Sequence, residues 1–365
     1  MTLPFAAAPD PALILLLAVL FDAAVGDPPW LYARVPHPVV LIGRAVGWLD
    51  RRLNRDGAGD ARRRLAGVAA LGAVAGLAAL VGWALSAALR QAPFGWLVEA
   101  ALLGTLIAQR GLYDHVADVA EALARDGLGA GRAAVARIVG RDPDSLDEAG
   151  VARAALESLA ENFSDGVVAP LFWGLLLGLP GVLAYKAINT ADSMIGHRTA
   201  RHRAFGWAAA RTDDAVNLVP ARLAGLLLVG AAFLLPGADA AGALSAMRRD
   251  APRHRSPNAG WQEAALAGAL GLALAGPRRY GGETIADAWM GEGGRADAGP
   301  ADIRRGLRLY VVACALAAGL VAVVTRLTAA FPPQRARAIS RIRSRSRWAA
   351  RWSARASRVE SISRS

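Results

Sequence analysis

The sequence predicts an all-α, polytopic membrane protein with broken or re-entrant helices and a helical segment outside the membrane. Apolar residues make up 54% of the 365-residue chain and occur in long blocks separated by charged connections. One block, Leu65–Leu89, contains no charged residue. As a helix it is long enough to cross a hydrocarbon core of about 30 Å at about 1.5 Å per residue.

Six apolar blocks are the candidate helices of the membrane region. They are Pro11–Val25, Leu65–Leu89, Pro93–Ala108, Gly166–Tyr185, Ala215–Leu235 and Leu307–Ala330. The first block lacks a basic leading segment and a small-residue cleavage site, so we expect a retained span rather than a signal peptide. The single cysteine, Cys314, lies in the last block, which argues against disulfides and cysteine-ligated metals within the chain.

The connections between these blocks are basic, and the positive-inside rule favours the cytoplasmic side for all of them. The four connections are Trp30–Arg64, Arg110–Asp165, Lys186–Asp214 and Pro236–Gly306. Leu65–Leu89 and Pro93–Ala108 then form a hairpin with a short outside turn. This arrangement places the polar motifs of the chain on one face of an inner (cytoplasmic) membrane.

The other two middle blocks fit this topology only if they do not fully cross the membrane. The motif GLPG at Gly178–Gly181 breaks the block Gly166–Tyr185, and Pro220 with Arg222 interrupts the block Ala215–Leu235. Backbone groups freed at such breaks are tolerated at membrane depth only inside protein or beside a wet cavity. We therefore expect re-entrant or cavity-lining helices here.

Residues from about 110 to 161 predict an extramembrane helical insert within an integral membrane domain, residues 1–331. An apolar face recurs at helical spacing at Leu112, Val116, Val119 and Leu123. Further on, Ser145-x-x-Glu148 has the pattern of a capping box and predicts the start of the next helix.

Residues 332–365 predict a disordered Arg/Ser-rich tail. From residue 334 onward the sequence has ten arginines and one glutamate, so the tail holds most of the net charge of +12. A segment of this composition cannot bury a core. We expect attraction to anionic lipid in the bilayer rather than binding to nucleic acid.

Three carboxylates are spaced along the end of the insert at i, i+4 and i+8: Glu157, Glu161 and Asp165. They lie on one face if the helix continues past Asn162. Solvation would explain them on an ordinary helix, but this face leads into an apolar block, where uncompensated charge is costly and usually functional. Mg²⁺ held by one or two carboxylates and substrate phosphates is the alternative that we favour.

A second polar cluster follows, in the stretch YKAINTADSMIGHR. Lys186, Asn189, Ser193 and His197 fall near one helical stripe, with Asp192 beside it. Lys186 is the only lysine among 42 lysines and arginines. It could be a cation at the membrane edge, but a compact ammonium kept in an arginine-rich chain suits a phosphate. The two clusters are thus predicted to be two walls of one phosphate-handling site.

Two more polar stretches extend this prediction. ARTDDAVNLVPARL places Asp213 and Asn217 at i, i+4, with Arg222 further on, and a small-residue helix begins near Asn258. A helix start of this kind can receive an anion, although plain capping is the commoner use. The sequence has neither a P-loop motif nor H-E-x-x-H, so we expect no P-loop nucleotide site and no catalytic zinc of that type.

The motifs resemble those of the adenosylcobinamide-phosphate synthase family (CobD/CbiB) of cobalamin biosynthesis. The matching stretches are GDPPW…HPVVLIGR, ESLAENFSDGVVAP, YKAINTADSM, RTDDAVNLVPARL and SPNAGWQEAALAGALG. They occur in order across residues 15–325. GGETIADAWMGEGG matches loosely, and the tail has no counterpart in the pattern.

The resemblance implies an ATP-dependent amide ligation at an inner membrane. Adenosylcobyric acid would be joined to (R)-1-aminopropan-2-ol or its O-phosphate, with ATP and Mg²⁺ required and other late corrinoid-pathway membrane proteins as possible partners. The roles expected from this chemistry are Mg²⁺ binding by Glu157, Glu161 and Asp165, phosphate binding by Lys186, and proton removal by Asp192 or Asp213. Glu161 would also serve catalysis directly, and the nucleotide would contact Lys186, Asn189, Ser193, Asn217, Arg222 and Asn258.

Two other functions remain open at this point. A polytopic carrier for an anionic solute could line its pathway with the same polar clusters. A non-catalytic scaffold for late corrinoid enzymes would not need the three carboxylates.

Overall fold

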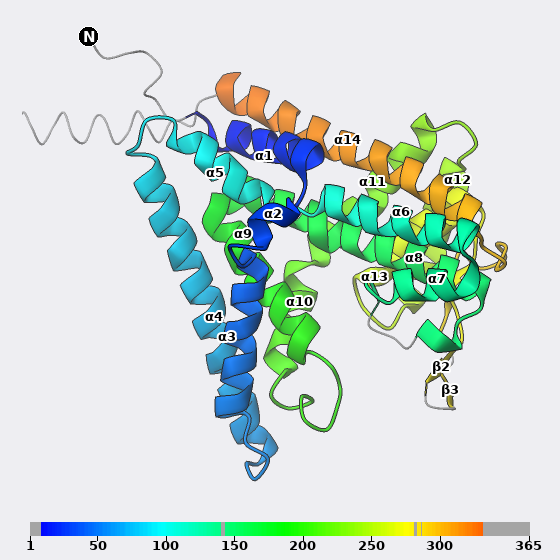
Figure 1. Ribbon diagram of the computed structural model, residues 1–365, viewed down its shortest axis with the longest axis horizontal. Helices are drawn as coiled ribbons and strands as arrows, with labels where there is room; N and C mark the ends of the chain where they lie inside the picture. Colours follow the sequence, from blue (N-terminus) through cyan, green and yellow to red (C-terminus); the bar gives the residue numbers. More distant parts are fainter. Residues whose placement is uncertain (1–8, 140–142, 281–282, 286, 331–365) are drawn as a thin grey trace, which may run out of the picture. The chain divides into compact units, whose positions relative to one another are not determined.

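The computed structural model describes residues 9–139, 143–280, 283–285 and 287–330 (Figure 1). Backbone contacts divide the chain into a unit Met1–Ala322 and a second unit Val323–Ser365. The features below belong to the first unit, apart from the end of its last helix. The tail predicted to be disordered, residues 332–365, lies outside the described residues.

Long apolar helices dominate the described structure and confirm the predicted all-α class. They are α1 (Pro11–Val25), α4 (Asp60–Leu89), α9 (Ala169–Ile195), α11 (Leu218–Leu234) and α14 (Pro300–Ala330). Three helical segments, Asp60–Leu89, Glu148–Ile195 and Pro300–Leu327, are long and apolar enough to cross a membrane. A bent pair of helices could supply a fourth crossing.

Strands are few and short in the described part of the chain. β1 (Leu274–Ala275) pairs with β4 (Trp289–Met290), and β2 (Arg278–Tyr280) pairs with β3 (Glu283–Ile285), both antiparallel. These hairpin pieces follow the helix α13 (Ala259–Leu270), which packs on α11 and α12 (Ala240–Asp250).

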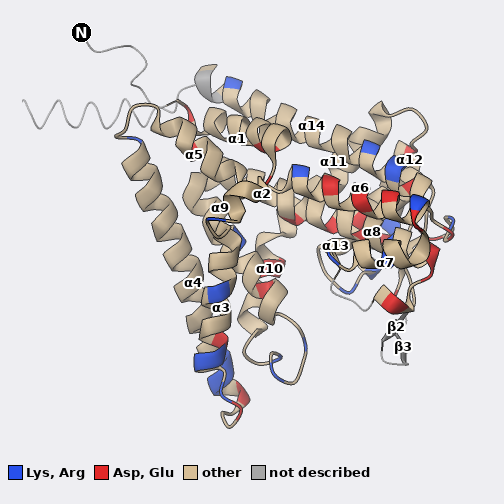
Figure 2. Ribbon diagram, viewed as in Figure 1, with Lys and Arg blue, Asp and Glu red and all other residues tan. Residues whose placement is uncertain are grey.

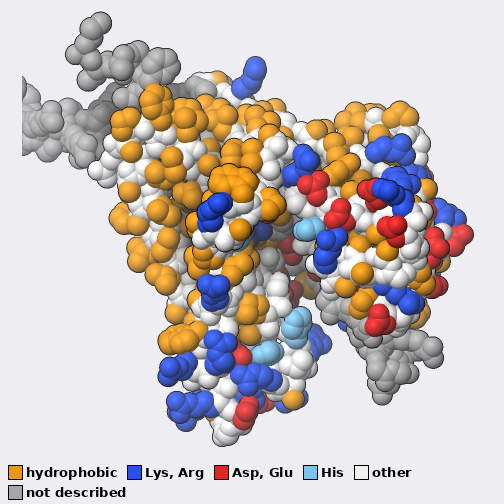
Figure 3. Space-filling view, in the orientation of Figure 1, with side chains coloured by type: hydrophobic (Ala, Val, Ile, Leu, Met, Phe, Trp, Pro, Cys, Tyr) orange, Lys and Arg blue, Asp and Glu red, His pale blue; other side chains and the backbone are white. Residues whose placement is uncertain are grey.

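An arm of the unit is built from α3 (Pro38–Leu53) and α4, preceded by the short α2 (Pro29–Tyr32). Large apolar side chains on this arm, such as Trp48, Leu77 and Trp83, are exposed, as a bilayer-facing surface requires. Arginines gather at the far end of the arm (Figure 2), where the α3–α4 connection lies, while hydrophobic side chains cover much of the rest (Figure 3). This distribution is typical of a helix pair that enters a membrane from a basic end.

The apolar block after α4 is shorter in the structure than the sequence predicts. Pro93–Ala108 was expected to return across the membrane, but its helix α5 covers only Gly95–Gly104. Ten residues of helix reach about 15 Å, half of the hydrocarbon core. The predicted hairpin of two full spans is therefore wrong, because this block forms a short helix and then an irregular connection.

The segment predicted to be an extramembrane insert forms α6 (Gln109–Arg125), α7 (Gly127–Val135), the 3-10 turn η2 (Pro143–Ser145) and α8 (Glu148–Asn162). The predicted apolar face of α6 is confirmed, since its four residues Leu112, Val116, Val119 and Leu123 are buried. The predicted capping box is wrong. Asp147, not Ser145, caps α8, because its carboxylate accepts the amide of Gly150 at 2.7 Å.

The predicted interruption at Gly178–Gly181 is present, but the one predicted at Pro220 and Arg222 is not. In α9, Gly178 has φ 65° and ψ −153°, a conformation outside the helical region, two residues before Pro180. The second break lies at Asn217 rather than at Pro220, where α10 (Trp207–Val216) and α11 meet at a bend of 47°. Proline is compatible with the first turn of a helix, which explains why Pro220 lies just inside α11 instead of ending a helix.

We expect Gly178→Ala to destabilise the protein by about 1–3 kcal/mol, because its backbone angles are essentially restricted to glycine. Thermal unfolding in detergent would show a lower midpoint. Gly76→Ala is a matched control. Gly76 lies in the middle of α4 on its exposed side, and no atom lies near the position that an added Cβ would take. It should be neutral or slightly stabilising. Equal midpoints for the two variants would contradict the strained break.

Candidate active site

The site begins at an irregular helical turn between α8 and α9. Phe163–Val168 forms a π-helix, η3, in which the amide of Ala169 bonds the carbonyl of Ser164. The next carbonyl, that of Asp165, would pair in the same pattern with residue 170. That residue is proline and has no N–H to donate. The carbonyl oxygen of Asp165 is thereby left for side-chain donors.

Two neighbouring side chains of α9 donate hydrogen bonds to this carbonyl oxygen. Lys186 Nζ and the Tyr185 hydroxyl each donate to the Asp165 oxygen at 3.2 Å. Both residues are buried, with only 8% of Lys186 exposed. Within the described part of the chain this is the only hydrogen bond of Nζ, so the ammonium keeps two of its three donors. Its bonded partner is a neutral carbonyl rather than a carboxylate.

Amide side chains join two carboxylates beside the lysine. Asn189 Nδ2 lies 3.3 Å from Asp165 Oδ2 and 3.2 Å from Asp213 Oδ1. Asn217 donates to the other oxygen of Asp213 at 3.0 Å and accepts from the Tyr185 hydroxyl at 3.1 Å. The predicted clusters of α9 and of the α10–α11 break are therefore one network, which includes Asp165.

More acidic residues surround this network. Glu161 and Asp214 lie within electrostatic range of Asp192. Asp22 of α1 lies within range of Lys186, and acidic side chains are visible in the hollow between the arm and the α6–α8 region (Figure 3). Asp192 itself is partly buried and makes no side-chain hydrogen bond or ion pair among the described residues. The site thus combines one buried ammonium with several carboxylates, the donor and acceptor set of a site for phosphate and a hard cation.

The structure does not assemble the predicted carboxylate triad. The side chain of Glu157 contacts β1 instead, where its Oε1 accepts a hydrogen bond from the amide of Ala275 at 2.9 Å. The described residues hold no group of three or more His, Cys, Asp or Glu side chains arranged for a metal ion. The π-helix is the reason. The one-face prediction required an uninterrupted α-helix, and a π-turn changes the angular spacing before Asp165.

We expect Glu157→Ala to lower stability by about 1–3 kcal/mol, because the buried amide of Ala275 would lose its acceptor. Glu157→Gln keeps an acceptor oxygen and should cost less. Unfolding midpoints of the two purified variants would test this order. Equal losses for the two variants would show that the charge, rather than the acceptor, matters.

Two other predicted site residues make local contacts. Ser193 is exposed and donates to the carbonyl of Asn189 at 2.9 Å. Arg222 bonds the carbonyl of Leu218 at 2.7 Å and lies 4.4 Å from the Trp261 ring centre. None of these contacts belongs to the Asp165–Asp213 network.

Asn258, at the start of α13, connects this polar stretch to the stretch ARTDDAVNLVPARL. Its Nδ2 donates to the carbonyl of Asp214 at 2.8 Å. The N-cap of α13 is Asn258, whose side chain makes no capping hydrogen bond, and the Ser256 hydroxyl lies 3.3 Å from the amides of Asn258 and Ala259.

The structure brings two further residues to the site, Tyr185 and Asp22, which the motifs did not predict. Asp22 is buried and accepts the amides of Gln109 and Arg110 at 2.9 and 3.3 Å. It therefore fixes the start of α6 against α1. A signal for it existed, since an aspartate inside an apolar block is expensive and usually functional. For Tyr185, a signal was the proline five residues after Asp165.

The segment that follows α9 is tied to the arm by another carboxylate. Asp50 accepts from Asn54 at 2.7 Å and from Arg201 at 2.8 Å. Burial raises the pKa of Asp50, but hydrogen bonds from Asn54 and Arg201 and the charge of Arg201 outweigh it and hold this pKa below its usual value. The stabilisation is therefore present above the unfolded-state pKa and lost as the pH falls through the lower folded-state pKa.

Fold and site together define a helical membrane protein with a buried lysine–carboxylate network at broken helices. The family model described as CobD/Cbib protein matches residues 15–310. The chain belongs to the CobD/CbiB family of cobalamin biosynthesis proteins, as its motifs predicted.

Relatives similar over most of the chain carry the name cobalamin biosynthesis protein CobD. One from Sinorhizobium sp is 52% identical over 317 residues, which is 86% of this chain and 98% of the relative. One from Rhizobium meliloti is 49% identical, over 83% of this chain and 94% of the relative. One from Rhodobacter capsulatus is 50% identical, over 86% and 98%. No solved structure matches the chain.

Proposed function

We propose that this protein joins an amino alcohol, (R)-1-aminopropan-2-ol or its O-phosphate, to adenosylcobyric acid in an ATP-dependent amide ligation. A propionate oxygen of the corrinoid attacks the γ-phosphorus of ATP, and ADP leaves. The amine then attacks the acyl carbon, phosphate leaves, and a base takes the proton of the amine. ATP supplies the activation that a carboxylate, a poor electrophile, lacks.

The observation that carries the proposal is the hydrogen bonding of Lys186. Its ammonium is buried, is held by the neutral carbonyl of Asp165, and keeps two donors in a chain with no other lysine. A buried ammonium with unused donors is suited to a transferring phosphoryl group, on which negative charge is spread in the transition state. Membership in the CobD/CbiB family supports the assignment of the corrinoid as substrate.

Asp165 and Asp213 are the residues that would hold Mg²⁺. Asn189 holds their carboxylates beside each other, and Mg²⁺ commonly takes only one or two protein carboxylates together with phosphates and waters. A preformed cluster of three ligands is therefore not required. When bound, the ion would neutralise negative charge on the nucleotide phosphates.

Asp192 is the better candidate for the base. Both oxygens of Asp213 accept amide hydrogen bonds from Asn189 and Asn217. Asp192 makes no side-chain hydrogen bond or ion pair within the described part of the chain. A base must be able to accept a proton within hydrogen-bond reach of the amine, and Asp192 has this capacity without breaking a bond.

The direct test incubates purified protein with adenosylcobyric acid, Mg-ATP and aminopropanol phosphate, and mass spectrometry looks for the amide. We expect the amide and a matching amount of ADP, with neither product when ATP is omitted. Uptake of an anionic solute by vesicles that contain the protein, without amide, would support a carrier instead. If the protein showed neither activity but other late corrinoid enzymes stayed bound to it, a scaffold would be supported.

The proposal places the site on the cytoplasmic side of the inner membrane, where ATP is available. We expect Ala200→Cys, in the exposed connection after α9, to resist an impermeant thiol reagent in intact cells and to react after permeabilisation. Cys314 would be replaced by alanine in the parent protein. Strong labelling of Ala200→Cys in intact cells would overturn this orientation.

A further inference from the structure

Two adjoining cavities run along one side of α14, within the first unit. The first has a volume of about 470 Å³ and reaches as deep as Ala318. The second, about 670 Å³, shares Tyr113 and Val311 with the first and extends to Arg304 and Arg308. Together they form one groove, here called the α14 groove, with an apolar interior and an arginine-bearing mouth.

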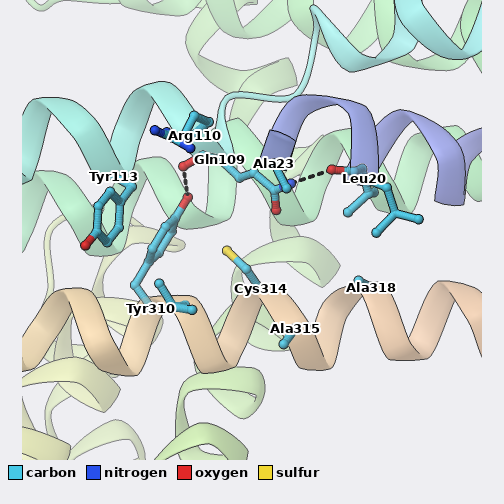
Figure 4. A pocket seen from close by; sticks show the side chains of 11 residues that line it. Leu20, Ala23, Gln109, Arg110, Tyr113, Tyr310, Cys314, Ala315 and Ala318 are labelled. Carbon is cyan, nitrogen blue, oxygen red and sulfur yellow. Dashed lines mark hydrogen bonds between the residues drawn. The ribbon is translucent and has the colours of Figure 1, made fainter. Parts of the chain in front are cut away.

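The interior of the α14 groove suits hydrocarbon. In Figure 4, Cys314, Ala315 and Ala318 of α14 face Leu20 and Ala23 of α1 across the cavity. These small side chains on α14 leave the space open.

The polar groups at this cavity are used within the protein, except the Tyr113 hydroxyl, which makes no hydrogen bond among the described residues. The Tyr310 hydroxyl donates to the carbonyl of Gln109 at 2.8 Å, and Gln109 Nε2 donates to the carbonyl of Val19 at 2.6 Å. Apart from Arg110, which pairs with Asp114 at 2.9 Å, the interior therefore offers a ligand mainly apolar contacts.

The mouth carries positive charge without a local counterion. Arg304 and Arg308 are exposed and lie one helical turn apart on α14. In the described part of the chain neither makes a hydrogen bond or an ion pair. The nearby Asp302 is already paired with Arg295 at 2.7 Å and with Arg305 at 3.2 Å. An external anion would balance the positive charge of these two arginines.

The length of the α14 groove matches one leaflet of a bilayer. Ala318 lies ten positions after Arg308, a rise of about 15 Å, and the hydrocarbon core is about 30 Å thick. α14 is itself long and apolar enough to cross a membrane. A chain that starts at the arginines and follows the groove therefore ends near the bilayer centre.

We infer that the α14 groove binds an anionic phospholipid from the surrounding bilayer. The phosphate lies between Arg304 and Arg308, and one acyl chain fills the apolar interior. Basic pockets between membrane helices recognise anionic headgroups in this way. The groove adjoins the site at Gln109 and Arg110, whose amides bond Asp22, but none of its lining residues is given a role in the proposed ligation, so the inference stands or falls independently of it.

Native mass spectrometry of the purified, delipidated full-length protein tests the site. Phosphatidylglycerol and phosphatidylcholine with identical acyl chains would be titrated separately. We expect the first phosphatidylglycerol to bind about tenfold or more tightly than the first phosphatidylcholine. The double variant Arg304→Gln/Arg308→Gln should lose this preference, and Arg326→Gln, at the other end of α14, should keep it.

A second variant examines the hydrocarbon part. Ala315→Trp fills the groove without changing charge and should weaken binding of both lipids. Its folding would be checked by its unfolding midpoint. Equal binding of the two lipids by the unchanged protein would overturn the site, as would a preference that survives in the double variant. Displacement of the lipid by inorganic phosphate alone, or by adenosylcobyric acid, would also overturn it.

Discussion

Replacing Lys186 with arginine is expected to lower the rate of amide formation by about 100-fold or more, with the protein still folded and inserted. Arginine keeps the positive charge, so the charge alone would predict little change. The guanidinium is larger and planar, however, and Lys186 is only 8% exposed and bonded to the Asp165 carbonyl. The compact donor geometry at a phosphate would be lost.

Ligation assays with matched variants decide whether the geometry of the Lys186 ammonium or only its charge is needed. Lys186→Met removes the charge without adding volume and should be at least as inactive, with an unfolding midpoint close to that of the unchanged protein. Arg90→Lys makes the reverse exchange at the exposed end of α4 and should keep full activity. Near-normal turnover of Lys186→Arg would show that Lys186 is only a cation at the membrane edge.

The second large effect is expected for Asp165→Asn, which should reduce turnover by about 100-fold or more. The exchange preserves shape and an acceptor oxygen for Asn189, but it removes the charge that a hard cation needs. Glu161→Gln should have a smaller effect and raise the Mg²⁺ concentration for half-maximal rate. Glu157→Gln should be nearly normal in activity, because that carboxylate contacts Ala275 instead.

Initial rates measured across a range of Mg²⁺ concentrations separate these variants. A partial return of activity at excess Mg²⁺ for Glu161→Gln would support a role near the ion. Unchanged rate and Mg²⁺ dependence in Asp165→Asn would remove this residue from the active site. The metal would then have to be sought at Asp192, Asp213 and Asp214.

Composition and apolar spacing predicted most of the fold. The bounds of α1 matched the first apolar block, and the buried face of α6 followed from its spacing. Where each break falls depends on tertiary contacts. Pro220 broke nothing, because the bend lies before it at Asn217, and α5 ended early although its sequence stays apolar beyond Gly104.

The candidate site was predicted in part. The spacing of Lys186 and Asn189, and of Asp213 and Asn217, placed pairs on shared helix faces, and the structure joins them with Asp165. Helix periodicity could not separate Glu157 from Asp165, because a π-turn has no strong sequence signature. Asp22 required knowledge of which helix packs beside α6.

The π-helix between α8 and α9 also fixes how many residues this stretch can contain. Each residue of an α-helix turns the chain by about 100°, so deleting one residue from Phe163–Val168 would rotate α8 against α9 by about that angle. The apolar composition would be unchanged, yet Asp165 would no longer meet Lys186 and Asn189. Loops such as the one between α3 and α4 can change length with little consequence for the site. In this short segment, by contrast, length itself is a requirement of the site, as strict as the identity of its side chains.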